Sequence, residues 1–174
     1  MRESGDHGPY NSWDRVPYIT TIRTGKPSII PEFREITRNY IISTYSSQEA
    51  IDTDDGSAYY NTHDNFFVYA ANGLKSDFGG HHNFHNDNLY GFVSNCWGGG
   101  NSNQFINNTC VANSANGGFR SDCQKSPLMT ISGNKIANSD GSLGSTKICD
   151  NTNTVEKWPS PEEVVAQAKT VVGF

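Results

Sequence analysis

Two aspartates recur at a spacing that could create a reactive site. Asp77 follows Asp54 after about 23 residues, a typical length for one coil of a repeat protein, and Asp55 directly follows Asp54. If the chain coils at this period, Asp54 (or Asp55) and Asp77 lie on neighbouring coils with carboxyl groups ~5 Å apart. A retaining glycosidase holds its nucleophile and its acid/base at this separation. Because two such close acids cannot both ionise easily, one pKa should rise and the two roles would separate.

A second column of charges permits a different chemistry. Lys75 and Arg120 share one face two coils apart, roughly 10 Å, with Gly98 between them. A polysaccharide lyase needs a base and a cation that neutralises the uronate, and these residues fit loosely. Alternatively, Lys75 pairs with Asp52, and Arg120 pairs with Asp122, as ordinary cross-strand ion pairs.

Metal and histidine chemistry is less well supported by the spacing. The densest acidic cluster comprises Asp52, Asp54, Asp55 and Asp77, whose oxygens could supply part of a calcium site, although no EF-hand loop is present. We expect no cofactor, and calcium stays an open alternative. His63 and His85 are close to one coil apart along the chain, and we expect them to line a sugar groove rather than bind a metal.

The expected site therefore has two groups of residues. The catalytic candidates are Asp54, Asp55 and Asp77. The substrate-binding candidates are Asp52, Lys75, Arg120, Asp122, His63 and His85.

A repeating strand would position these side chains. Four short segments begin with an apolar residue and recur at nearly equal steps along the chain: Ile51, Leu74, Trp97 and Phe119. Since alternate residues of a strand face opposite sides, the apolar column is buried and the charged columns face outward. A chain that stacks like strand on like strand at this period is an all-β parallel β-helix.

A column of asparagines supports the same period. Asparagine followed by two mostly apolar residues recurs at Asn39, Asn65, Asn88, Asn108 and Asn134. Stacked asparagines can hydrogen-bond from coil to coil and tolerate the left-handed backbone of a turn. We count about five rungs.

The chain divides into three parts. Residues 1–35 form an N-terminal leading segment and cap, residues 36–153 the β-helix, and residues 154–174 a C-terminal capping helix. The helix signal is Ser160-Pro161-Glu162-Glu163, with an N-cap, a proline at the first position and an acid at the third. We expect this amphipathic helix to cover the last rung.

Composition narrows the class of protein. The 174 residues suit one domain, and a hydrophobic content of 34% with 17 glycines suits a narrow solenoid. The net charge of −5 and the lack of a basic stripe argue against nucleic acid as a partner. The sequence contains no run of eighteen apolar residues, so it predicts no membrane span. No signal peptide is visible at Met1.

The cysteines and one sequon favour a secreted protein. Cys123 and Cys149 are about one rung apart, and Cys96 and Cys110 could form the other bridge, but four cysteines allow three pairings. The even count and the sequon Asn107-Asn108-Thr109 favour an oxidised, glycosylated, extracellular protein.

Three strings carry a family resemblance: Asp6-His7-Gly8-Pro9-Tyr10-Asn11-Ser12-Trp13-Asp14-Arg15, Ile51-Asp52-Thr53-Asp54-Asp55-Gly56-Ser57 and Asn72-Gly73-Leu74-Lys75. The chain resembles secreted right-handed parallel β-helix proteins of the pectate-lyase-like superfamily, most closely the β-xylosidase-type β-helix glycoside hydrolases. The resemblance implies catalytic acids on neighbouring rungs, with Asp54 or Asp55 as the first. For the second acid it implies a Glu or Asp within the Gly-Leu-Lys strand, where this chain has Asp77 with Phe78 beside it.

Three functions follow as expectations. The leading one is an extracellular glycoside hydrolase, with carbohydrate as the partner. The second is a polysaccharide lyase acting on a uronate. The third is a non-catalytic structural or carbohydrate-binding solenoid that self-associates through its ends.

Overall fold

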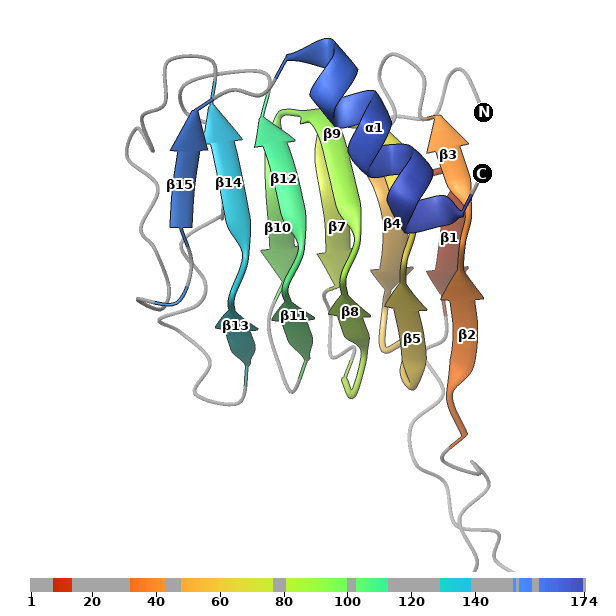
Figure 1. Cartoon of the computed structure of the whole chain (residues 1–174). Helices are drawn as coiled ribbons and strands as arrows, with labels where there is room; N and C mark the ends of the chain where they lie inside the picture. Colours follow the sequence, from red (N-terminus) through yellow and green to blue (C-terminus); the bar gives the residue numbers. More distant parts are fainter. Residues whose placement is uncertain are drawn as a thin grey trace, which may run out of the picture.

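The computed structural model describes residues 8–13, 32–42, 48–76, 81–99, 103–112, 129–138, 152, 154–157 and 160–173. Within these ranges the chain is mostly β-structure and ends in one helix (Figure 1). The described strands form three sheets of four, five and six strands, and all of their pairings are parallel.

The three sheets are named here in the order in which the chain first reaches them. The first sheet contains β1 (Tyr10–Trp13), β4 (Glu49–Asp54), β7 (Asn72–Ser76) and β10 (Asn95–Gly99). The second contains β2 (Arg34–Thr37), β5 (Tyr60–His63), β8 (Phe84–Asn86), β11 (Gln104–Ile106) and β13 (Thr130–Ser132). The third contains β3 (Tyr40–Ile42), β6 (Phe66–Val68), β9 (Leu89–Val93), β12 (Thr109–Ala112), β14 (Lys135–Asn138) and β15 (Thr154–Lys157).

From β1 to β12 the chain visits the three sheets in strict rotation, so neighbours within a sheet are three strands apart in sequence. The predicted strand column is confirmed, because Ile51 pairs with Leu74 and Leu74 pairs with Trp97. Phe119 lies outside the described residues. β1 falls within the predicted leading segment, yet it is the edge strand of the first sheet, with Tyr10 opposite Ile51.

The asparagine column is confirmed as a continuous ladder at the turn between the second and third sheets. Each Nδ2 donates to the Oδ1 of the next rung: Asn39 to Asn65 at 3.0 Å, Asn65 to Asn88 at 3.0 Å, Asn88 to Asn108 at 3.2 Å and Asn108 to Asn134 at 3.1 Å. The residue before each asparagine has a positive φ: Arg38, Asp64, Asp87, Asn107 and Gly133. The ladder therefore fixes the same left-handed turn at every rung.

A second, shorter ladder was not predicted. Asn83 and Asn103 lie before β8 and β11, at the start of the second sheet. The Oδ1 of Asn83 accepts from the Tyr60 amide at 3.1 Å, and the Oδ1 of Asn103 accepts from the Asn83 amide at 3.0 Å. Both side chains are buried, so the interior between the three sheets contains polar columns whose amides satisfy one another.

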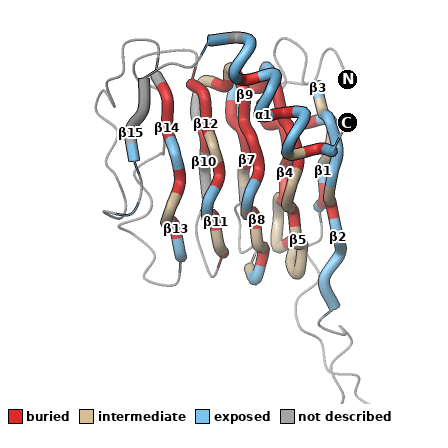
Figure 2. Tube along the Cα trace, viewed as in Figure 1, coloured by how far each residue is buried: buried red, intermediate tan, exposed pale blue. Residues whose placement is uncertain are grey.

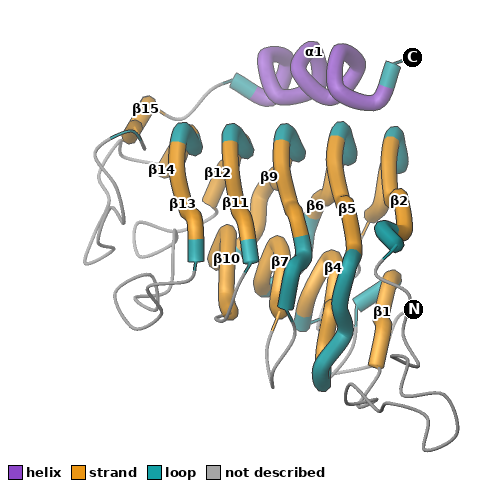
Figure 3. The backbone as a smooth tube through the Cα atoms, turned by 90° about the horizontal axis from the view of Figure 1, so that it is seen from below, coloured by secondary structure: helices purple, strands orange, loops and turns teal. Residues whose placement is uncertain are grey.

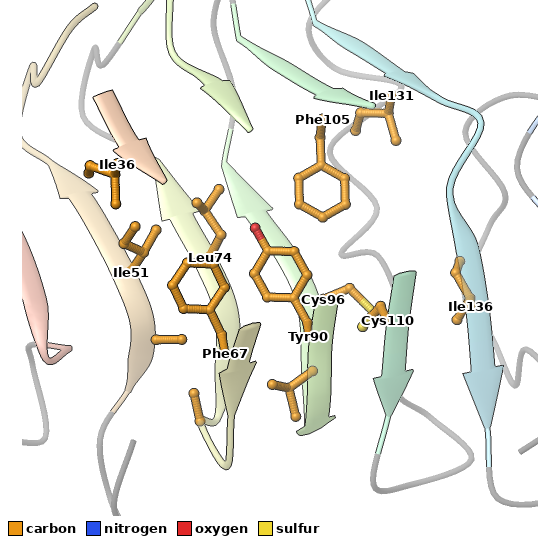
Figure 4. Packing of buried hydrophobic residues seen from close by; sticks show 13 residues of the cluster. Ile36, Ile51, Phe67, Leu74, Tyr90, Cys96, Phe105, Cys110, Ile131 and Ile136 are labelled. Atoms are coloured by element: carbon orange, nitrogen blue, oxygen red, sulfur yellow. A yellow bond between two sulfur atoms is a disulfide. The ribbon is translucent and has the colours of Figure 1, made fainter. Parts of the chain in front are cut away.

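The apolar core is a narrow column between the three sheets (Figures 2 and 4). The rings of Phe67, Tyr90 and Phe105 stack from rung to rung, with centroids 5.2 and 5.6 Å apart. Cys96 of β10 and Cys110 of β12 form a disulfide in this column, with Cα atoms 5.8 Å apart. This is one of the pairings left open by the sequence; Cys123 and Cys149 lie outside the described residues.

The predicted helix is confirmed as α1 (Pro161–Val172). Ser160 Oγ accepts from the Glu163 amide and Glu163 Oε2 accepts from the Ser160 amide, both at 3.2 Å, which completes a capping box.

The predicted position of α1 is wrong. The helix lies across the outer face of the third sheet, over β6 and β9, rather than over the last rung (Figures 1 and 3). Val164, Ala168 and Val172 pack there in one cluster with Phe66 and Leu89. The physical reason is that the third sheet is apolar on both faces, and α1 removes the outer face from water. No helix in the described ranges is long and apolar enough to cross a membrane.

Candidate functional site

Three neighbouring strands bring polar side chains to the outer face of the first sheet. The parallel register places Asn11 of β1 beside Asp52 of β4, and Asp52 beside Lys75 of β7. Two residue pairs further along, Trp13 lies beside Asp54. Because alternate residues share a face, Asn11 with Trp13 and Asp52 with Asp54 point to the same side.

Lys75 joins the two carboxylates. Its Nζ lies 3.7 Å from Asp52 Oδ2 and 3.4 Å from Asp54 Oδ2. Asn11 Nδ2 donates to the same Asp52 oxygen at 2.9 Å. The lysine thus bridges the two carboxylates, and its ion pair with Asp52 confirms that half of the cross-strand alternative raised from the sequence. The other half, Arg120 with Asp122, lies outside the described residues.

Asp52 is the most perturbed group of the site. Its side chain has no exposed surface, and its Oδ1 has no hydrogen-bond partner among the described residues. Burial, with a smaller contribution from Glu49 and Asp54, raises the pKa of Asp52 to about 7 against the opposing effects of Lys75 and Asn11. Asp52 therefore changes charge near neutral pH. Complete burial prevents the direct substrate contact that we expected of it.

Asp54 is the carboxylate of this site that reaches the surface. Its side chain is 14% exposed, and its Oδ1 accepts from the Asp55 amide at 2.9 Å. Asp55 and Gly56 have positive φ values of 43° and 87°, so the chain turns sharply at the end of β4. The turn thus fixes the Asp54 carboxylate at the rim of the sheet.

Trp13 provides the apolar surface of the site. It is 64% exposed and lies beside Asp54 in the register. An exposed aromatic ring beside a carboxylate and an ammonium group suits a sugar, whose C–H face can stack on the ring while its hydroxyls bind the charges. The sequence alone did not place β1 in this sheet, although the alternation of Tyr10 and Ser12 with Asn11 and Trp13 was available as a signal.

The predicted partners of this site are only partly described. Gly98 pairs with Lys75 as the sequence suggested, but Asp77, Arg120 and Asp122 lie outside the described residues. The pairing of Asp54 with Asp77 therefore stays a prediction.

The histidine prediction needs a correction. His85 is completely buried and faces the core, paired with Thr62 and Phe105 rather than with His63. Burial lowers the pKa of His85 to about 3, so it stays neutral and cannot line a groove.

His63 lies on the outer face of the second sheet, away from His85. Its Nδ1 is 2.7 Å from Asp64 Oδ2 and its Nε2 is 3.0 Å from Glu35 Oε2. The hydrogen bond with Asp64 raises the pKa of His63, and Glu35 adds to the effect. This cluster is an ion-pair network between two rungs, on a different sheet from Lys75.

Within the described part of the chain, no three acidic, histidine or cysteine side chains gather closely enough to hold a metal ion. Comparisons with known protein families, with curated proteins and with solved structures found no match to this chain. The functional argument therefore depends on the geometry of the site.

Proposed function

We propose that this chain is a single right-handed parallel β-helix of about five rungs that hydrolyses glycosides outside the cell. The strict rotation of the strands among three parallel sheets supports a coil, and crossovers between parallel strands are right-handed in nearly all proteins. The Cys96–Cys110 disulfide supports an oxidising compartment. The resemblance to pectate-lyase-like β-helix proteins points in the same direction.

One observation carries the proposal: Trp13, Asp54 and Lys75 share one outer face, above the buried Asp52. Asp54 would act as the nucleophile and Asp77 as the acid/base, with Asp55 as the alternative nucleophile. Lys75 would orient substrate hydroxyls while it holds Asp54. Trp13 would bind the sugar ring.

The lyase alternative is weaker at this site. A lyase base must be an unprotonated amine before it takes the proton, whereas two carboxylates within 4 Å stabilise the ammonium form of Lys75.

A non-catalytic carbohydrate-binding solenoid is the second candidate. It is favoured by the position of Lys75 between two carboxylates, which is also the arrangement of a structural ion-pair network. Such a protein would bind saccharides through Trp13 or assemble through its ends, and it would show no turnover.

The test is a screen of polysaccharides and aryl-glycosides, read for new reducing ends and for the ultraviolet absorbance of unsaturated sugars, with and without chelator. We expect reducing ends without absorbance. The variant Asp54→Asn should lose about 10²–10⁴-fold in kcat, since it removes the nucleophile but keeps the side-chain shape. The matched control is Glu35→Gln, an exposed carboxylate on the second sheet, which should keep full activity.

Each outcome of the screen selects one function. Turnover that survives in Asp54→Asn removes Asp54 from the mechanism. Absorbance without hydrolysis supports the lyase. Saccharide binding without any product supports the solenoid, and loss of activity with chelator assigns a role to calcium.

A further inference from the structure

A groove of about 500 Å³ lies between one flank of α1 and the turns that lead into the third sheet. Asp87, Asn107 and Thr109 line its sheet side, together with Leu89, and Gln167 and Thr170 line its helix side. The groove is far from the Lys75 bridge in the fold, because it borders the third sheet and the bridge lies on the first. Its volume falls in the range of small-molecule sites, about 300–1,000 Å³.

The sequon Asn107-Asn108-Thr109 forms one wall of this groove. Asn107 is exposed and occupies the left-handed turn position, with φ of 55°. Asn108 is buried in the asparagine ladder, where it contacts Asn88 and Asn134. The ladder therefore fixes the middle residue of the sequon and leaves the two outer residues beside the groove.

The Asn107 side chain has a defined orientation. Its amide hydrogen-bonds to the Asp87 carboxylate, which accepts from Nδ2. Its Oδ1 faces Gly133 so closely that a Cβ at Gly133 would clash with it. Nδ2 thus points toward Asp87, into the groove, and carries a second hydrogen that this bond does not use.

We propose that Asn107 carries an N-linked glycan whose first N-acetylglucosamine residue packs into this groove against α1. The donor is an oligosaccharide linked to a lipid diphosphate. The bond between sugar C1 and the diphosphate oxygen breaks, a bond from C1 to Nδ2 forms, Nδ2 loses one proton, and the lipid diphosphate leaves. The remaining N–H of Nδ2 still donates to Asp87.

The lining of the groove suits this sugar. Asp87, Gln167 and Thr170 offer acceptors and donors for its hydroxyl and amide groups, and Leu89 and Val171 offer an apolar surface for its acetyl methyl. A docked sugar would connect the sheet to α1, whose other contacts come from one apolar stripe. The inference depends on the proposed extracellular location and not on hydrolase activity.

The first experiment measures occupancy of the site. The full chain is secreted from a eukaryotic cell, and tryptic peptides are read by mass spectrometry. We expect N-acetylhexosamine on Asn107 in the parent and in Thr109→Ser, which preserves the sequon, and none in Thr109→Val or Asn107→Gln. An unmodified Asn107 in the secreted, folded parent overturns the proposal.

The second experiment measures docking. Release of the glycan by a peptide amidase should be about tenfold slower from the native than from the denatured protein, because the groove must open first. Gln167→Ala combined with Thr170→Ala should increase the native rate several-fold. Equal rates from native and denatured protein overturn the docking. Since neither readout uses turnover, a glycosylated but inactive protein would overturn the proposed function alone.

Discussion

The asparagine ladder and the Asp52–Lys75–Asp54 bridge both connect neighbouring strands of stacked parallel sheets. They differ in charge, because the ladder consists of neutral amides and the bridge of ionisable groups. In the ladder, each neutral amide donates to the rung above and accepts from the rung below, and Asn65, Asn88, Asn108 and Asn134 are all buried. In the bridge, one ammonium group serves two carboxylates, and Asp52 Oδ1 has no hydrogen-bond partner among the described residues.

This difference suggests that the ladder stabilises the fold and that the bridge is the reactive part of the same structure. A repeated neutral side chain with both a donor and an acceptor can continue indefinitely, because every added rung satisfies the one before it. A column of charges cannot repeat in this way, since each buried charge needs a partner of opposite sign. We therefore expect the ladder to carry folding energy and the bridge to carry chemistry.

The largest expected effect comes from a break in the middle of the ladder. In Asn88→Ala, the Thr62 carbonyl and the Asn65 backbone amide each lose a hydrogen bond in a buried environment. Asn65 Nδ2 loses its bond to Asn88 and keeps those to the Ile36 and His63 carbonyls. We expect a loss of about 3–5 kcal/mol in the free energy of unfolding, measured by urea denaturation. The control Asn39→Ala, at the exposed end of the ladder, should lose about 1 kcal/mol. Equal losses would show that the ladder does not act through burial.

The variant Asp52→Asn, which removes the ionisable group, tests the bridge. The native pKa of Asp52, about 7, lies above the usual value of 3.8, so the native state binds a proton that the unfolded state has released. The free energy of unfolding should therefore fall as pH rises from about 4 to about 7, by up to about 4 kcal/mol. In Asp52→Asn this component should be absent. The free energy of unfolding is measured by calorimetry across this pH range. If it changed equally with pH in the wild type and in the variant, the raised pKa of Asp52 would be contradicted.

His63 gives the smallest expected effect, because its ion pairs are partly exposed. Its pKa is raised, so its contribution is complete below about pH 6.5 and disappears as pH rises through the native pKa. The variant His63→Gln should lose about 0.5–1 kcal/mol at pH 5.5 and nothing at pH 9, and salt should reduce the loss. Thermal denaturation at the two pH values checks this, and a loss that is equal at both would show that His63 acts through packing.

The period of the sequence predicted the parts of the fold that repeat. The Ile51–Leu74–Trp97 column and the Asn39–Asn134 ladder were both visible as recurring residue types, and both are confirmed. Lys75 beside Asp52 followed from the same register. In each case the argument required only a nearly constant length of chain per coil.

Departures from the period caused two of the three errors. His85 falls one position short of a full coil after His63, and the register of the second sheet places Asn86 beside His63 instead. A shift of one residue moves a side chain to the opposite face, and His85 therefore enters the core. β1 was missed as a member of the first sheet because the chain between Tyr10 and Ile51 is much longer than the later coils. The position of α1 depends on which apolar face is largest, a tertiary property that the helix sequence does not contain.

The ladder asparagines also determine how this protein can change in length. Consecutive members are 26, 23, 20 and 26 residues apart, yet the same hydrogen bond joins each pair. The anchor point of each coil is thus independent of the size of the coil. Residues can be inserted or deleted elsewhere in a coil, and whole coils can be duplicated, while every amide in the column still finds its neighbour.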